Sequence, residues 1–400
     1  MSNLKTIPRV AGFSFATLAA GIKKPGKLDL GLIYSQVPAR CAGVFTTNRV
    51  VAAPVTLTAA RIRRQPCQAI LVNSGNANAC TGEAGLQDAR CSAELLAAAL
   101  EIDAESVAVA STGVIGKPLP MEKLTAAIPQ LPAQLSEHGA AQLAESIMTT
   151  DSFAKLSAQT GEVNGTAYQI LGIAKGAGMI HPNMATMLAF VLTDAAVSDA
   201  LLATALRQGV AQSFNVITVD RDTSTNDMVL LLANGQSSAA EILPGTPEAE
   251  RFCRQLNAVL LDLAKMIVRD GEGATKLVEI RVLGAVDATQ ARQAACSVAT
   301  SNLVKTAFFG EDANWGRIIA AVGYSGAEVA PERIAIRFDQ VTVVENGLGT
   351  GPELEREATA VLKRPEFSVE VDLGLGAGSC SYYTSDLTYD YVRINADYRT

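Results

Sequence analysis

Histidine, paired cysteine and aromatic residues are scarce in this sequence of 400 residues. Only two histidines are present, His138 and His181, so a metal site built on several imidazoles is excluded. The seven cysteines form no CxxC pair, which argues against a zinc site and predicts buried thiols in a reducing compartment. We therefore expect no metal or other cofactor.

Charge and hydropathy argue against nucleic acid and membranes as partners. The net charge is −7, and the longest basic run, Arg61–Arg64, is typical of a solvated helix face. No apolar run reaches the roughly 18 residues of a membrane span. Glycine, serine and threonine interrupt the apolar stretch over residues 10–22, and Phe13 and Phe15 at period two favour a first strand over a signal peptide. We expect a cytoplasmic protein.

Alanine and aliphatic residues are abundant in the sequence. Hydrophobic residues make up 48% of the chain and aromatic residues only 5%. A chain of this length can bury a large core, and the composition fits a compact α/β or α+β enzyme.

Short apolar and periodic segments predict strands and helices along the whole chain, with no hinge or low-complexity linker. The predicted strands cover residues 28–34, 42–48, 52–57, 68–73, 166–173, 186–193, 214–220, 277–283, 334–338, 341–344, 369–373 and 389–394. The predicted helices cover residues 86–100, 121–127, 139–147, 198–213, 247–269, 288–306 and 354–362.

The most informative stretch is Lys175–Phe190, KGAGMIHPNMATMLAF. A glycine-rich turn and a Pro-Asn corner precede an apolar run that opens at Thr186, which predicts a buried strand. If the peptide bond before such a threonine is cut, the freed α-amine can act as the base for the adjacent hydroxyl, because the pKa of that amine is about 7.7–8.0. Threonine is also a common strand former, so an ordinary turn before a strand is the alternative interpretation.

A second glycine turn ends the strand that is predicted to open at Ser106. Gly116 and Lys117 do not form a phosphate-binding loop, because Ser111 stands where such a loop needs glycine and Pro118 where it needs serine or threonine. A threonine hydroxyl and a glycine amide can instead both donate to a developing negative oxygen. We interpret this turn as an oxyanion hole.

Two polar segments are interpreted as structural. The asparagine-rich turn over residues 74–82 is expected to be a loop near the site, with asparagine and glycine supplying turn conformations. Residues 222–227 contain two aspartates and an asparagine, but their spacing does not match a calcium-binding loop, so we assign them to turn capping.

The stretch Lys175–Phe190 resembles the signature of the ornithine acetyltransferase family, and the resemblance extends over the whole chain. In that family the chain cuts itself between the residues that correspond to Ala185 and Thr186, and the freed threonine carries the acetyl group. The resemblance implies chains of residues 1–185 and 186–400, which form one integrated α+β fold of packed β-sheets flanked by helices. It also implies a heterotetramer of two chains of each kind.

The resemblance also implies roles for individual residues. Thr186 is the nucleophile, and Thr112 and Gly113 form the oxyanion hole. The implied substrate-binding residues are Thr149, Thr150, Lys175, Thr186, Glu272, Asn395 and Thr400, with Thr149 and Thr150 taken together because the resemblance does not separate them. Arg221 stands where many family members have glycine, a departure that concerns that turn rather than the nucleophile.

The implied reaction transfers the acetyl group of N2-acetyl-L-ornithine to L-glutamate through acetyl-Thr186. Acetyl-CoA as a further acetyl donor stays open. Two alternatives are a hydrolase related to the L-aminopeptidase/D-esterase enzymes, which share this kind of self-cleaved nucleophile, and a non-catalytic binding protein. A dependence of product formation on glutamate separates transfer from hydrolysis, and an uncut chain in active preparations would favour the binding protein.

Replacement of the proposed nucleophile tests its double role. Thr186→Ala should abolish self-cleavage and acetyl transfer together, because the same hydroxyl attacks the Ala185 carbonyl first and the acetyl donor later. Thr186→Ser should retain part of both activities. On a denaturing gel the alanine variant should run as a single uncut chain, and normal cleavage of that variant would refute the assignment.

Overall fold

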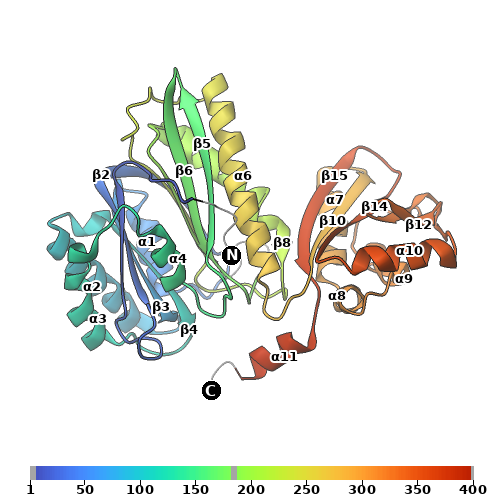
Figure 1. Cartoon of the computed structure of the whole chain (residues 1–400), viewed down its shortest axis with the longest axis horizontal. Coiled ribbons are helices and arrows are strands. Elements are labelled where there is room, and N and C mark those ends of the chain that lie inside the picture. The colour runs from blue at the N-terminus through green and yellow to red at the C-terminus, as the bar shows by residue number, and fades with distance from the viewer. Residues whose placement is uncertain (1–5, 182–186, 398–400) are drawn as a thin grey trace. The chain divides into compact units, whose positions relative to one another are not determined.

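The computed structural model describes residues 6–181 and 187–397, which fall into two compact units (Figure 1). Of these residues, unit 1 holds 6–179, 187–215 and 222–267, and unit 2 holds 180–181, 216–221 and 268–397. Each unit contains its own β-sheet together with helices. The α+β class is therefore confirmed.

The sheet of unit 1 has the strand order β4-β3-β2-β9-β7-β6-β5, with β1 paired to β2. Its strands are β1 (Phe13–Leu18), β2 (Leu30–Phe45), β3 (Cys67–Asn76), β4 (Val107–Val114), β5 (Lys155–Val163), β6 (Thr166–Lys175), β7 (Leu188–Thr193) and β9 (Met228–Ala233). The long strand β2 joins two halves of the sheet, because it pairs with β3 through Leu30–Tyr34 and with β9 through Arg40–Phe45.

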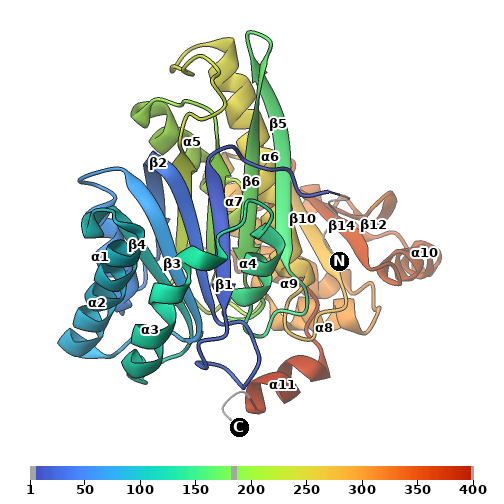
Figure 2. The ribbon, with the colours of Figure 1, turned by 60° about the vertical axis from the view of Figure 1, so that its left-hand side comes forward.

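The helices of unit 1 cover both halves of this sheet. They are α1 (Ala53–Arg61), α2 (Gly82–Leu100), α3 (Met121–Ala127), α4 (Ala140–Ser146), α5 (Asp199–Ala211) and α6 (Pro247–Arg269). Helices α1–α3 lie beside β3 and β4 (Figure 2), and α6 lies along β5 and β6 (Figure 1). Side chains from both halves of the sheet and from α4 form one core, with Ile70, Leu143 and Phe190 among them.

Segments on both sides of the proposed cleavage point lie in this one sheet. Strand β6, which precedes it, pairs antiparallel with β7, which follows it, with Ile173 opposite Phe190. Strand β7 in turn pairs parallel with β9, starting at Leu188 and Met228. The two pieces of a cut chain would therefore share hydrogen bonds and a core. Strand β7 begins at Leu188, whereas the strand was predicted from Thr186, a residue outside the described ranges.

The sheet of unit 2 has the order β13-β12-β11-β14-β10-β15-β8. Its strands are β8 (Ile217–Thr218), β10 (Leu277–Ala285), β11 (Ala335–Phe338), β12 (Val341–Glu345), β13 (Leu348–Gly349), β14 (Glu366–Asp372) and β15 (Gly378–Ser385). Its helices are α7 (Ala288–Thr300), α8 (Asn302–Phe309), α9 (Trp315–Gly323), α10 (Pro352–Leu362) and α11 (Tyr389–Ala396).

Residues 28–34 and 42–48, predicted as two strands, belong mostly to the single strand β2, and four further predicted elements were wrong. Residues 52–57 form the start of α1 rather than a strand, because Pro54 fits the first helical turn and alanine and leucine favour a helix. Residues 389–394 belong to α11, which Thr388 caps by accepting a hydrogen bond from the Tyr391 amide. The helix predicted over 288–306 is two helices, since Ser301 is extended and caps α8. Of residues 214–220, only Ile217–Thr218 is a strand.

The cysteine prediction and the assignment of the basic run also need correction. Of the seven thiols, all free in the described structure, Cys67 is buried, Cys80 is exposed and the rest are half-buried. In the basic run Arg61 is only 4% exposed. Its Nη1 donates to the Val107 carbonyl at 2.9 Å and its Nε to Glu105 at 3.2 Å, so it joins α1 to the start of β4.

No helix in the described part of the chain is long and apolar enough to cross a membrane.

A buried lysine joins α8 to the end of β15 in unit 2. Lys305 is 2% exposed, and its Nζ donates to Thr384 Oγ1 at 3.0 Å, to Ser385 Oγ at 3.1 Å and to the Ser385 carbonyl. Burial lowers the pKa of Lys305 to about 7, although the charges of Asp386 and Asp220 act in the opposite direction.

Lys305 should make the unfolding free energy depend on pH. Because the pKa of Lys305 is lower in the folded than in the unfolded chain, the unfolded chain binds more protons between pH 7 and pH 10, and stability rises with pH there. Relative to Lys305→Met, the wild-type chain should gain about 2 kcal/mol of unfolding free energy from pH 6.5 to 8.5, at most about 1.4 kcal/mol per pH unit. Denaturant unfolding of both proteins measures this, and parallel pH profiles would contradict it.

Candidate active site

The predicted site residues lie in both units. Unit 1 contains Thr112, Gly113, Thr149, Thr150 and Lys175, and unit 2 contains Glu272 and Asn395. The predicted nucleophile Thr186, its neighbour Ala185 and the predicted substrate-binding residue Thr400 lie outside the described residues.

The predicted oxyanion turn is the last part of β4, where the backbone runs very close to β3. Gly113 has φ +134° and lies opposite Gly75. A Cβ on Gly113 would lie 2.3 Å from the Gly75 carbonyl carbon and 2.5 Å from the Asn76 nitrogen, so no other residue fits there without moving the backbone. Thr112, beside it, is buried. Glycine is therefore required at this position by packing.

The asparagine-rich turn at the end of β3 lies next to Gly113. Asn76 Nδ2 donates to the carbonyls of Lys117 and Pro118 at 3.2 and 2.9 Å, and Asn78 Nδ2 donates to the Gly85 carbonyl at 2.8 Å. The turn thus connects β3 to the segment after β4 and to the start of α2. Residues 77–81 form the predicted loop, whereas residues 74–76 of the predicted turn belong to β3 and Gly82 belongs to α2.

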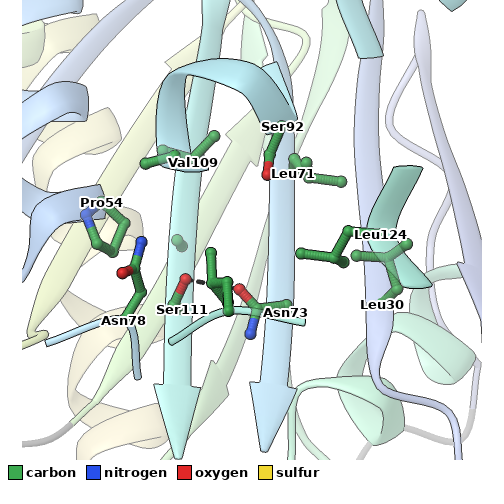
Figure 3. A pocket seen from close by; sticks show the side chains of 12 residues that line it. Leu30, Pro54, Leu71, Asn73, Asn78, Ser92, Val109, Ser111 and Leu124 are labelled. Atoms are coloured by element: carbon green, nitrogen blue, oxygen red, sulfur yellow. Dashed lines mark hydrogen bonds between the residues drawn. The ribbon is translucent and has the colours of Figure 1, made fainter. Parts of the chain in front are cut away.

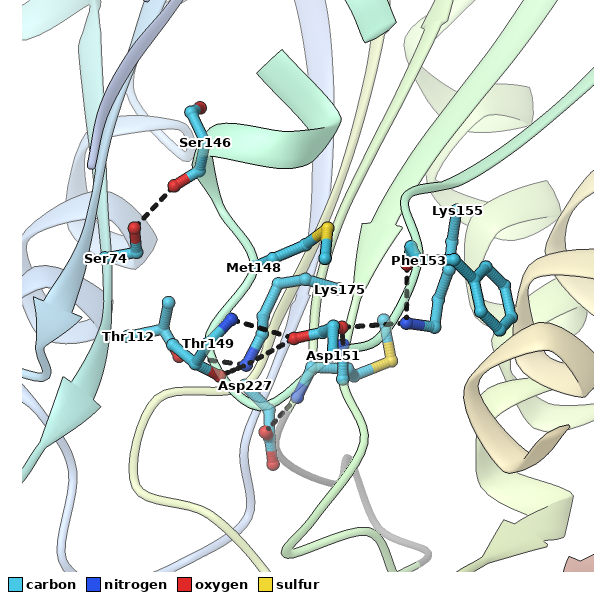
Figure 4. Close-up of polar contacts among 12 residues, drawn as sticks. Ser74, Thr112, Ser146, Met148, Thr149, Asp151, Phe153, Lys155, Lys175 and Asp227 are labelled. Atoms are coloured by element: carbon cyan, nitrogen blue, oxygen red, sulfur yellow. Dashed lines mark hydrogen bonds and ion pairs between the residues drawn. The ribbon is translucent and has the colours of Figure 1, made fainter. Parts of the chain in front are cut away.

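Lys175 brings two of the predicted threonines together. It is 2% exposed at the end of β6, so it is not the exposed residue that lysine usually is. Its Nζ donates to Thr149 Oγ1 at 2.8 Å and to Thr112 Oγ1 at 3.3 Å (Figure 4). Thr149, one of the predicted threonine pair, therefore contacts the lysine.

A buried aspartate that sequence reasoning missed organises this cluster. Asp151 Oδ1 accepts from Lys155 Nζ at 2.8 Å, and Oδ2 lies 3.8 Å from Lys175 Nζ (Figure 4). Its two oxygens also accept from the amides of Gly176 at 2.6 Å and Thr149 at 2.9 Å. Burial would raise the pKa of Asp151, but the two lysine charges and these hydrogen bonds hold it below its ordinary value. Asp151 is thus ionised at neutral pH.

Lys23 adds a further positive charge near the same segment. Its Nζ donates to the Met148 carbonyl at 2.6 Å and to the Ser146 carbonyl at 3.1 Å. Burial and, to a smaller extent, the charge of Lys175 lower the pKa of Lys23 to about 8, although Asp29 and Asp151 oppose these effects. Together, the half-buried Lys23 and the buried Lys155 and Lys175 favour binding of an anionic group such as a carboxylate. No sequence motif marked Lys23.

In unit 2 the structure brings the other predicted pair together. Asn395 Nδ2 on α11 donates to Glu272 Oε2 at 2.8 Å, and Glu272 is only 8% exposed. The loop that carries Glu272 is held by Asp386, which accepts from the amides of Thr275 and Lys276 at 2.8 and 3.0 Å. Glu272 is therefore a fixed carboxylate rather than a mobile helix-end residue.

A cavity beside β3 and β4 is too small for a substrate. It measures about 10 Å³, which is room for roughly one water molecule. Asn73 and Ser111 line it, and Ser111 Oγ donates to Asn73 Oδ1 at 2.6 Å (Figure 3). Among the residues that the structure describes, no group of three or more His, Cys, Asp or Glu side chains is arranged to hold a metal ion.

Known proteins resemble this chain over nearly its whole length. The ArgJ family model matches residues 14–400. The arginine biosynthesis bifunctional protein ArgJ of Syntrophotalea carbinolica is 66% identical over 393 residues, 98% of this chain and 100% of that protein. Its namesake from Geobacter sulfurreducens is 55% identical, with 98% and 100% covered. The crystal structure of the Bacillus halodurans protein of that name, 46% identical, has a TM-score of 0.50 and covers 52% of this chain and 97% of the crystallised one.

Lys155 and Lys175 both interact with the Asp151 carboxylate, so they provide a matched pair of variants. Lys175→Met and Lys155→Met each remove a buried cation from Asp151, so both should lower the unfolding free energy, by up to about 3–5 kcal/mol. Lys175 also contacts Thr112 and Thr149. The kcat/KM of Lys175→Met for acetyl transfer should therefore be at least about tenfold lower than that of Lys155→Met, which corresponds to about 1.4 kcal/mol of transition-state stabilisation. Thermal unfolding and steady-state assays measure both effects, and equal kcat/KM for the two variants would contradict the role of Lys175.

Proposed function

Because the chain belongs to the ArgJ family, we propose that it is an acetyltransferase of arginine biosynthesis that moves the acetyl group of N2-acetyl-L-ornithine to L-glutamate. The observation that carries this proposal is the buried contact of Lys175 with Thr112 and Thr149, because it joins an expected oxyanion-hole residue to two expected substrate-binding residues. The names of the relatives with 66% and 55% identity support a biosynthetic role and do not favour a hydrolase or a non-catalytic protein.

The reaction begins with self-cleavage. The Thr186 hydroxyl attacks the Ala185 carbonyl, and the peptide C–N bond breaks, which moves the acyl group to the hydroxyl oxygen and frees the α-amine of Thr186. Hydrolysis of the resulting ester then restores the hydroxyl and separates the two chains. That amine then accepts the hydroxyl proton while the oxygen attacks the acetyl carbonyl of acetylornithine. The amine passes the proton to the departing nitrogen, ornithine leaves, and acetyl-Thr186 remains. The α-amine of glutamate attacks this ester, and acetylglutamate leaves with the hydroxyl restored.

Thr112 is suited to stabilise the negative oxygen of each tetrahedral intermediate. Its Oγ1 accepts a hydrogen bond from Lys175, so its own hydroxyl hydrogen can donate to that oxygen. The Gly113 amide is the second proposed donor. A donor of this kind contributes roughly 2.7–4 kcal/mol to lowering the barrier. The positive charge of Lys175 strengthens the acidity of the Thr112 hydroxyl and so favours this role.

The two substrates share an α-amino acid group, but their side chains end in opposite charges. Lys175 favours the carboxylate of glutamate, and Glu272 favours the ammonium group of ornithine. Both side chains are buried, at 2% and 8% exposure, which increases the strength of such interactions. Exclusion of water from the acyl-enzyme would let transfer compete with hydrolysis. Asn395, which binds Glu272, is proposed to contact substrate with Thr149, Thr150 and Thr400.

Further parts of the proposal concern partners and location. We propose that acetyl-CoA is a second acetyl donor to Thr186, that chains 1–185 and 186–400 assemble as a heterotetramer, and that the enzyme acts in the cytoplasm. The word bifunctional in the names of the relatives supports a second activity.

Steady-state kinetics test the covalent intermediate. With acetylornithine varied at several fixed glutamate concentrations, the double-reciprocal lines should be parallel, because ornithine leaves before glutamate binds. Continuous ornithine release should require glutamate. Intersecting lines would contradict the intermediate, and unchanged ornithine release without glutamate would indicate a hydrolase.

A further inference from the structure

The segment Ser224–Asp227, predicted to be a capping turn, is buried and connects distant parts of unit 1. Its four residues are all less than 8% exposed. Within the segment Thr225 Oγ1 donates to Asn226 Oδ1 at 2.6 Å, and the Asn226 amide donates to Ser224 Oγ at 3.1 Å. These local bonds fix the direction of the Asn226 side chain.

Asn226 holds the strand that carries the expected oxyanion hole. Its Nδ2 donates one hydrogen to the Ala77 carbonyl at 2.6 Å and the other to the Ser111 carbonyl at 2.9 Å. Ser111 immediately precedes Thr112, and its hydroxyl is held separately by Asn73 (Figure 3). The orientation of the peptide that leads into Thr112 is therefore fixed by a side chain more than one hundred residues away.

Asp227, the next residue, holds the start of β7. Its Oδ1 accepts from the Met187 amide at 2.9 Å, and Met187 directly follows Thr186 (Figure 4). The pairing of β7 with β9 begins one residue later, at Leu188 and Met228. The Met187 amide therefore lies just before the paired part of β7, and the Asp227 side chain supplies its hydrogen-bond acceptor. Burial raises the pKa of the Asp227 carboxyl well above its ordinary value, although the Met187 hydrogen bond and the charge of Lys175 oppose this.

We propose that Asn226 and Asp227 are positioning residues that together set the spacing between the oxyanion hole and the nucleophile. Consecutive residues on a buried backbone have a fixed separation, so the carbonyl before Thr112 and the amide after Thr186 are held at a fixed separation as well. The inference rests on the proposed function, because it takes the roles of Thr112 and Thr186 from it. Neither residue needs to touch substrate.

The chemistry of the carboxamide explains why residue 226 is an asparagine. Two carbonyl oxygens need two N–H donors, and the side-chain amide supplies both on one nitrogen. An aspartate of the same shape would place a negative oxygen against two carbonyl oxygens or, when protonated, would satisfy only one of them. Asn78 offers a matched control, because it is also fully buried and its Nδ2 donates to the Gly85 carbonyl at 2.8 Å, at the start of α2.

The test compares Asn226→Asp with Asn78→Asp in the full chain. Both variants should lower the melting temperature, since each leaves a buried carbonyl without its donor. Asn226→Asp should also lower kcat at least tenfold with KM within about twofold, and should slow self-cleavage to a similar degree. Asn78→Asp should keep kcat and the cleavage rate within about threefold. If both variants lose kcat equally, Asn226 acts only on stability and the proposal is overturned.

A second pair covers the case in which Asn226→Asp does not fold. Asp227→Asn keeps an oxygen that can accept from the Met187 amide, whereas Asp227→Ala removes it. Asp227→Asn should cleave itself at least tenfold faster than Asp227→Ala and have the higher kcat. Equal rates for these two variants would overturn the positioning role.

The Thr186→Ala variant separates this inference from the proposed function. If it cleaves normally, the proposed function fails whatever the other variants do. If it stays uncut while Asn226→Asp matches Asn78→Asp, only the inference fails.

Discussion

The ion pairs of Asp151 with Lys155 and Lys175 are the interaction on which the candidate site depends. Removing two ammonium groups and a carboxylate from water costs several kcal/mol per ion, and only close geometry with further hydrogen bonds offsets that cost. Here the carboxylate also accepts from the amides of Thr149 and Gly176. The same side chain therefore fixes the segment of Thr149 and the end of β6, where Lys175 reaches Thr112.

The sheet of unit 1 imposes the second constraint. Strands before and after the proposed cleavage point pair with each other, and β2 pairs with β9, so each piece of a cut chain would be held by the other. Cleavage can then free an amine at Thr186 without releasing the strand that follows it. In this arrangement Asp227 anchors the amide of Met187, and Gly113 lets β4 approach β3 closely.

Sequence patterns predicted the long helices α2 and α6 well, but they divided the long strand β2 into two strands and missed other strands. Helices α2 and α6 were found from their apolar stripes, because these stripes face the sheet over several turns. Helix α11 was predicted as a strand because tyrosine and valine favour strands. The cap at Thr388 stabilises the helix instead. Strand β5 was missed because several of its residues are polar and exposed, and β15 because it is rich in serine. Of the candidate site residues, the family resemblance supplied Thr112 and Lys175 in unit 1 and Glu272 in unit 2. Asp151, Lys23 and Asn226 act through contacts between segments far apart in sequence, which no local motif records.

The central claim is that Thr186 carries the acetyl group. The most direct measurement incubates the purified enzyme with N2-acetyl-L-ornithine alone, quenches it in acid and maps its peptides by tandem mass spectrometry. If Thr186 carries the acetyl group, the peptide that begins at Thr186 should bear one acetyl group. That group should be lost when glutamate is added before the quench. An unmodified Thr186 peptide with acetylglutamate still formed on addition of glutamate, or an acetyl group on another residue that glutamate removes, would contradict this claim.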